Sequence, residues 1–103
     1  MHPEYPCAHC ISAGAAAAVI EAVLGSKSIP EVAMTSTTAP GITHRWADLD
    51  AFCQEVSNAR VWAGFHYRFS TVVGTDMGLR IGDYVVKNVM QPVSEPTLIS
   101  GPR

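Results

Sequence analysis

The sequence has little charge of either sign and no positive excess. Seven lysines and arginines stand against nine aspartates and glutamates, so the 103 residues carry a net charge of −2 at pH 7. Binding to nucleic acid or to an acidic membrane depends largely on a basic surface, so we expect neither partner. Apolar residues make up 48% of the chain and charged residues only 16%, which excludes a disordered protein.

Long apolar runs and cysteines are also scarce. An uncharged stretch of the first half, residues 7–20, contains polar side chains and is shorter than the roughly 20 apolar residues of a membrane-spanning helix. No basic flank followed by an apolar run, as in a secretion signal, opens the chain. The three cysteines allow at most one internal disulfide and leave one thiol. A reducing compartment fits this count better than secretion, and we expect a cytoplasmic protein.

Most of the sequence shows residue patterns that are typical of helices. Residues 8–24 are rich in alanine, and Gly25 follows as a suitable helix C-cap. From Trp46 to about residue 61, apolar residues recur every three or four positions, as on one face of a helix. A third helix is predicted from about residue 70 or 71 to residue 90.

Residues 25–44 separate the first two helices and contain two prolines, several hydroxyl residues and a turn signal at Pro40-Gly41. We expect a long loop there. No segment shows the alternating pattern of a half-buried strand. The sequence therefore predicts an all-α fold, a small bundle of three principal helices with a long loop.

Small residues recur at four-residue spacing on the first and third helices, which predicts close helix packing. Each glycine costs up to about 1 kcal/mol in a helix interior, so close backbone approach should compensate. The residues concerned are Gly74, Gly78 and Gly82 on the third helix and Gly14, Ala18 and Ala22 on the first. The rest of the third helix is too apolar for one layer to bury, so we expect oligomerisation, a homodimer or larger, to complete the bundle.

We expect one truncated domain over residues 1–91 and an extended, proline-containing arm over residues 92–103.

Two clusters in the domain contain side chains suited to binding or catalysis. In residues 3–10, His9 lies at the start of the first helix. In residues 59–68, Arg60 ends the second helix and precedes His66 by six positions.

If the first and third helices pack as predicted, His9 and His66 both lie at helix N-termini, where free N–H groups favour an anion. Arg60 can face the gap between them. Its guanidinium offers a planar fork of donors, while one imidazole ligates or attacks the central atom and the other moves a proton. The pattern indicates an oxyanion site and a small-molecule substrate.

These residues resemble a known family. Pro6-Cys7-Ala8-His9 is similar to the segment Pro-Ser-Gly-His of the vanadium-dependent haloperoxidases and their relatives, the type 2 phosphatidic acid phosphatase superfamily. Ala59-Arg60, followed after five residues by His66, is similar to the family's Ser-Arg and later histidine. The resemblance covers roughly residues 2–88.

The resemblance implies a role for each matching residue. His66 would be the ligand of a vanadate cofactor, or the nucleophile that becomes phosphohistidine in a phosphatase. His9 would be the general acid and base, and Arg60 an oxyanion donor. Cys7 and the backbone N–H near Ala8 would also contact the oxyanion. The implied activity is peroxide-dependent halide oxidation or, alternatively, phosphoester hydrolysis.

Three departures from the family pattern weaken this site. Cys7 replaces a serine with a poorer donor, and Ser70 replaces the aspartate that orients the ligand histidine. The family's first segment, a lysine followed by Arg-Pro, has no counterpart in the six residues before Cys7. We therefore expect either a partner-dependent unit, in which a second chain supplies charge through Arg45, Arg68 or Lys87, or a domain that has lost the ancestral chemistry.

Other functions stay open from the sequence alone. Residues 7–10, Cys-Ala-His-Cys, resemble a thiol–disulfide oxidoreductase motif but lack the preceding strand. Zinc would need a second close pair of ligands, beyond scattered residues such as His2, His44 and Cys53. A cysteine-dependent small-molecule hydrolase could pair Cys7 with His9 or Cys10 with His66. The non-enzymatic alternative is an oligomeric helical fragment.

Overall fold

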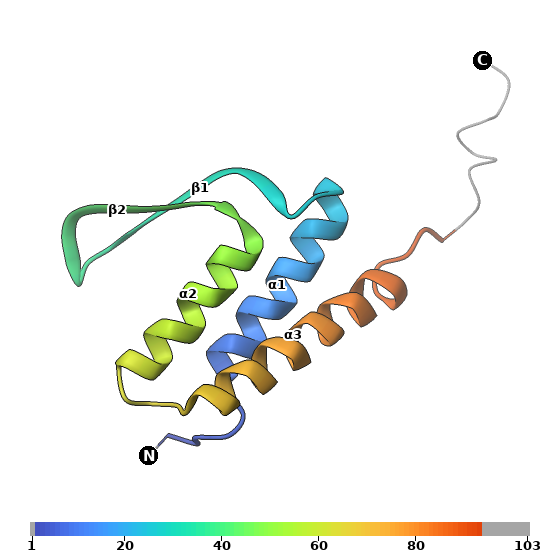
Figure 1. Cartoon of the computed structure of the whole chain (residues 1–103). Coiled ribbons are helices and arrows are strands. Elements are labelled where there is room, and N and C mark those ends of the chain that lie inside the picture. The colour runs from blue at the N-terminus through green and yellow to red at the C-terminus, as the bar shows by residue number, and fades with distance from the viewer. Residues whose placement is uncertain (1, 94–103) are drawn as a thin grey trace, which may run out of the picture.

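The computed structural model describes residues 2–93, which form three helices and a two-stranded antiparallel sheet (Figure 1). In chain order the elements are α1 (Ala8–Leu24), β1 (Ser28–Ser36), β2 (Ala39–Asp48), α2 (Leu49–Trp62) and α3 (Arg68–Asn88). The prediction of an all-α fold is wrong, because the fold is mixed. Most of the expected arm at 92–103 lies outside the described residues.

The segment expected to be a loop forms the hairpin. Its turn lies at residues 37–38 rather than at Pro40-Gly41, and the Thr38 N–H donates to the Ser36 hydroxyl, 3.2 Å away. Trp46, expected to begin the second helix, instead lies in β2 and pairs with Val32 of β1.

The hairpin gives no strand signal because nearly every residue of both strands is exposed or half-buried. A strand without a buried face has no reason to alternate apolar and polar residues. Pro30 and Pro40 also argue against central strands, but both strands of a two-stranded sheet are edges, where proline is tolerated.

The helices begin and end close to their predicted limits, for local reasons. Gly25 ends α1 with φ of 73°, and its N–H donates to the Glu21 carbonyl, 2.7 Å away. The Asp48 carboxylate caps α2 by accepting the Ala51 N–H at 2.9 Å. α3 begins at Arg68, two residues before the predicted start.

Glycines bring α1 and α3 into backbone contact. A Cβ added at Gly78 would lie 2.1 Å from the Ile11 carbonyl oxygen, and one at Gly82 would lie 2.6 Å from Ala18 Cβ. The predicted close approach of these two helices is confirmed. Ala22, the last member of the stripe expected on α1, is exposed and takes no part in these contacts.

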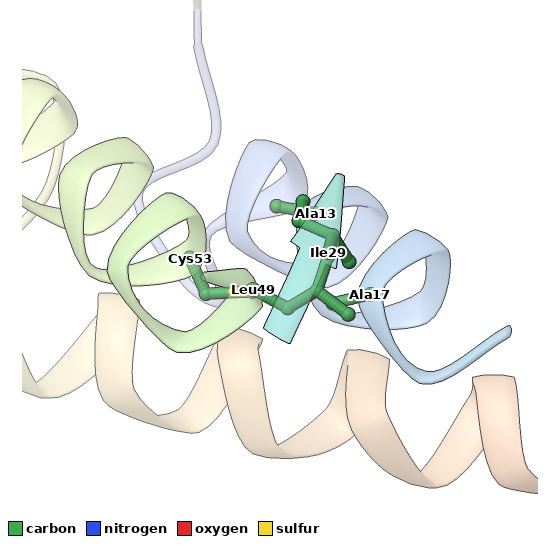
Figure 2. Close-up of a cluster of buried hydrophobic side chains, with 5 residues drawn as sticks. All are labelled: Ala13, Ala17, Ile29, Leu49 and Cys53. Atoms are coloured by element: carbon green, nitrogen blue, oxygen red, sulfur yellow. The ribbon is translucent and has the colours of Figure 1, made fainter. Parts of the chain in front are cut away.

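The apolar core is small and lies between α1, α2 and the start of β1, as Figure 2 shows. Its buried members are Ala13, Ala17, Ile29, Leu49 and Cys53. Phe52 and Val56 of α2 pack against it. Within residues 2–93, no helix combines the length and the apolarity needed to cross a bilayer.

Trp46 fastens the base of the hairpin to α2. Its ring meets the Phe52 ring edge-on with centroids 5.4 Å apart, and its Nε1–H donates to the Glu55 carboxylate at 2.6 Å. The same carboxylate pairs with His44 of β2 at 2.6 Å. The hairpin therefore packs on α2, and in Figure 1 it lies on the side of α2 away from α3.

Candidate functional site

The starts of α1 and α3 and the end of α2 lie at one end of the bundle, next to the N-terminal segment (Figure 1). The Cys7 N–H donates to the Ser70 carbonyl at 3.2 Å, which ties the start of α1 to the first turn of α3. After α2, Gly64 adopts φ of 78°, and the N–H groups of Phe65 and His66 fold back onto the Arg60 carbonyl at 3.2 and 3.3 Å. This turn places His66 beneath the end of α2.

The His66 imidazole is held in a defined tautomer. Its side chain is 0% exposed, and its Nδ1 lies 2.6 Å from the Glu4 carbonyl oxygen. Because a carbonyl oxygen only accepts hydrogen bonds, Nδ1 must carry the proton. In the neutral ring, Nε2 then has a free lone pair, as a ligand or a nucleophile requires.

Arg60 and His2 lie on the Nε2 side of His66. His2 Nε2 lies 3.1 Å from His66 Nε2 and 3.4 Å from Arg60 Nη2, and the tautomer of His2 decides which of the two it bonds. The Arg60 guanidinium stacks over the Phe65 ring, 4.5 Å from its centroid, while its buried Nε has no hydrogen-bond partner within residues 2–93. We call Arg60, His66 and His2 the imidazole–guanidinium cluster.

The cluster has more donors than acceptors. His2 Nε2 can donate to the His66 Nε2 lone pair or accept from Arg60, but it cannot do both. One of these two groups is therefore unsatisfied within residues 2–93, in addition to the unpartnered Nε of Arg60. An oxyanion between Arg60 and His66 would accept from the guanidinium and place its central atom at Nε2.

Glu4 contacts His66 from the opposite, Nδ1 side. Its Oε1 accepts the Tyr67 N–H at 2.8 Å and lies 3.7 Å from His66 Nδ1. The Ser70 hydroxyl and the Tyr67 N–H hold the pKa of Glu4 below its usual value, against the opposing effect of desolvation. Ser70 Oγ is fully buried and has no partner in regular hydrogen-bond geometry among the residues that the structure describes.

Desolvation also affects His2, although its ring is exposed. It is the largest cause that lowers the pKa of His2, and Coulomb interactions with His66 and the Arg60 guanidinium lower this pKa further. A neutral His2 is therefore favoured beside the guanidinium.

The remaining predicted site residues lie outside this cluster. His9 and Ala8 are exposed in the first turn of α1, and within residues 2–93 the His9 side chain forms no hydrogen bond. Arg68 turns toward α2, where its Nη1 donates to the buried Ser57 hydroxyl at 3.0 Å. The structure thus brings Arg60 and His66 together. Among the described residues, the side chains of His9 and Arg68 form no hydrogen bond with either of them.

Cys7 and Cys10 form a disulfide, and both residues are completely buried. In this form neither sulfur is available as the nucleophile of a Cys7–His9 or a Cys10–His66 pair. Cys53 is the remaining thiol, and burial raises its pKa. Across the described part of the chain, no three His, Cys, Asp or Glu side chains gather where they could hold a metal ion.

Sequence reasoning assigned no role in the oxyanion site to His2 and Glu4. Both precede the Pro6-Cys7-Ala8-His9 segment directly, and that proximity is the only signal the sequence offers. Glu4 contacts His66 partly through its main-chain carbonyl. Every residue has this group, so the identity of residue 4 does not indicate the contact.

Comparisons with known proteins agree with this fold. The family described as "VCPO second helical-bundle domain" matches residues 1–95. The crystal structure of an apo-type bacterial vanadium-dependent chloroperoxidase superposes with a TM-score of 0.68 at 19% sequence identity. The match covers 82% of this chain and 21% of that one, so the chain spans about a fifth of the chloroperoxidase. No curated protein matches the chain.

The fold and the family match define a helical-bundle domain of the vanadium haloperoxidase type. The chain belongs to the family of VCPO second helical-bundle domains. The resemblance that its two motifs indicated is confirmed.

Proposed function

We propose that the imidazole–guanidinium cluster binds vanadate and serves peroxide-dependent halide oxidation. One observation carries the proposal. His66 donates its Nδ1 proton to the Glu4 carbonyl, so its Nε2 lone pair is open to a ligand once the exposed His2 ring moves aside, next to the incompletely satisfied guanidinium of Arg60. A single nitrogen ligand with adjacent N–H donors suits a metal oxyanion, whose own oxygens complete the coordination.

The chain's residues would hold vanadate in a simple arrangement. His66 Nε2 would ligate the central atom, and Arg60 would donate to the oxygens of vanadate through Nη2 and Nε. The exposed ring of His2 occupies this space, so it would turn aside on binding at the expense of its contacts to Arg60 and His66. Vanadate, when bound, would supply the Lewis-acidic centre at which peroxide oxidises a halide.

His9 keeps its proposed role as proton carrier. It lies exposed in the first turn of α1, at the end of the bundle where the cluster also lies. Cys7 cannot act as a thiol donor while it is bonded to Cys10. On this side the backbone N–H at Ala8 is the proposed donor to the oxyanion.

One guanidinium balances only part of the charge of vanadate, and Arg68 is engaged with Ser57. We propose that further cations come from a second polypeptide segment. The outer face of α3 is apolar and exposed, with Val72 59% and Tyr84 65% accessible, which supports association with a second copy of the chain. A monomer at micromolar concentration in light scattering would contradict that association.

Titration with vanadate tests the proposed function. Wild-type protein should show a saturable rise in melting temperature and a broadened bound signal in ⁵¹V NMR. His66→Ala should remove both, while His44→Ala, which changes an exposed histidine of the hairpin, should leave both unchanged. Binding that survives His66→Ala would remove the proposed ligand. Turnover of an aryl phosphate without peroxide would instead identify a phosphatase acting through phosphohistidine at His66.

A further inference from the structure

We infer that Glu4 is the positioning residue of this site, fixing His66 in the tautomer and orientation that direct Nε2 at the oxyanion. The inference rests on the proposed function, since it assigns a supporting partner to the proposed ligand. Its evidence is the set of contacts that Glu4 makes with residues 66, 67 and 70.

Glu4 holds His66 through two independent groups. Its carbonyl oxygen takes the Nδ1 proton at 2.6 Å, which fixes the tautomer. Its carboxylate accepts the N–H of Tyr67, the next residue along the chain, at 2.8 Å. The side chain thus clamps the backbone beside His66, and this clamp keeps the Glu4 carbonyl directed at Nδ1. Neither contact would survive a shift of the N-terminal segment away from α3.

The carboxylate also acts on the ring electrostatically. Its Oε1 lies 3.7 Å from Nδ1, and no other carboxylate pairs with His66 among residues 2–93. When Nε2 binds an electron-poor centre, positive charge develops on the imidazole, and a carboxylate at Nδ1 stabilises it. The His66 side chain is 0% exposed, so water reaches this interaction only from the side of the Glu4 carboxylate, which is 35% exposed.

Ser70 completes the arrangement. Its hydroxyl is fully buried and has no partner in regular hydrogen-bond geometry within residues 2–93. Position 70 lies one turn along α3 from Tyr67: the Ser70 N–H donates to the Tyr67 carbonyl at 3.1 Å, and the Tyr67 N–H donates to the Glu4 carboxylate. A negative charge introduced at position 70 should substitute for that of Glu4.

The test combines binding with a tautomer measurement. Glu4→Gln removes the charge and gives the Tyr67 N–H a weaker acceptor, which loosens the contact that keeps the Glu4 carbonyl directed at Nδ1. Vanadate affinity should fall by about 10–100-fold, as for loss of the partner behind a metal-bound histidine. Histidine ¹⁵N NMR should show the proton of His66 redistributed between Nδ1 and Nε2. Glu31→Gln, which removes a carboxylate paired with Arg45 on the hairpin, is the matched control and should change neither readout.

Rescue separates positioning from folding. Adding Ser70→Asp to Glu4→Gln should restore at least tenfold of the lost affinity and return the proton to Nδ1. If that double variant does not fold, Glu4→Asp provides the conservative test, and it should retain more affinity than Glu4→Gln while keeping the proton at Nδ1.

Two results distinguish this inference from the proposed function. If Glu4→Gln binds vanadate as tightly as wild type with unchanged ¹⁵N shifts, Glu4 has no positioning role and vanadate binding stands. If wild-type protein does not bind vanadate, the proposed function fails. The ¹⁵N measurement on Glu4→Gln then still decides whether Glu4 sets the tautomer of His66, and unchanged shifts would overturn the inference.

Discussion

Two contacts in the molecule are built on opposite principles. One joins α1 to α3, and the other joins the hairpin to α2. α1 and α3 meet backbone to backbone at glycines, with no room for a single methyl group at Gly78. The hairpin exposes most of its residues and is fastened to α2 at its base, chiefly by Trp46. The candidate site lies at the end of the first contact. Its residues are thus placed by the part of the molecule with the least freedom to rearrange.

This difference also explains why α3 contains glycines, although they lower its helix propensity. Glycine inside a helix is unfavourable on its own, yet it allows the two helices to pack at a separation that side chains would prevent. The hairpin needs no such fit, because cross-strand pairs such as Arg45 with Glu31 act within it. The following predictions test this contrast, from the largest expected effect to the smallest.

Gly78→Ala should give the largest loss of stability. Although alanine is favoured over glycine in a helix, the new Cβ would meet the Ile11 backbone, so we expect a net loss of about 3 kcal/mol. Urea denaturation measures it. Val72→Ala, on the exposed side of the same helix, is the control and should cost under about 1 kcal/mol. A stabilised Gly78→Ala protein would show that the two helices do not touch.

Arg60→Ala should weaken vanadate binding by about 2 kcal/mol, roughly 30-fold, because a charged hydrogen-bond donor is lost. Its effect on the free energy of unfolding should be much smaller than that of Gly78→Ala. Arg80, an exposed arginine paired with Asp76 on α3, provides the comparison. Equal loss of binding in Arg80→Ala and Arg60→Ala would mean that vanadate responds only to net charge.

Trp46→Ala should release the hairpin without unfolding the helices. We expect a loss of about 1–2 kcal/mol, less than for a fully buried tryptophan, because this ring is half-buried. Hydrogen exchange should accelerate in β1 and β2 and stay slow where α1 meets α3. Ile42→Ala, at an exposed position of β2, should alter neither region. Faster exchange throughout α1 would show that the two regions unfold together.

The smallest effect concerns the ion pair between Lys27 and Asp50, which links the start of the hairpin segment to α2 at 3.1 Å. Asp50 raises the pKa of Lys27 above its usual value of 10.5. The pair therefore stabilises the fold fully below the unfolded pKa, and this contribution disappears as pH rises through the higher folded pKa. Lys27→Met should lower the melting temperature slightly at pH 7 and match wild type near pH 12. A difference that grows with pH would reverse the assigned sign.

The sequence predicted the features whose causes are local or periodic. Alanine-rich and amphipathic segments defined the helices, and four-residue glycine spacing predicted the contact of α1 with α3. The spacing of Arg60 and His66 led to the correct family. The hairpin was missed because its strands have no buried face to impose alternation, and Trp46 fitted a helical pattern as well as a strand.

The site was predicted only in part, because much of it depends on groups that residue types do not reveal. Glu4 uses its main-chain carbonyl, and His2 reaches the cluster across 64 residues of sequence. Arg68 was assigned to the oxyanion on its charge alone, whereas the structure directs it to Ser57.

The most direct test of the central claim is a crystal structure of the protein soaked in vanadate, with an anomalous difference map recorded at the vanadium absorption edge. We predict one strong peak bonded to His66 Nε2, with its oxygens in hydrogen-bond reach of Arg60 and the His2 ring displaced. A fully occupied peak elsewhere on the protein, or an empty map at a saturating vanadate concentration, would contradict the account.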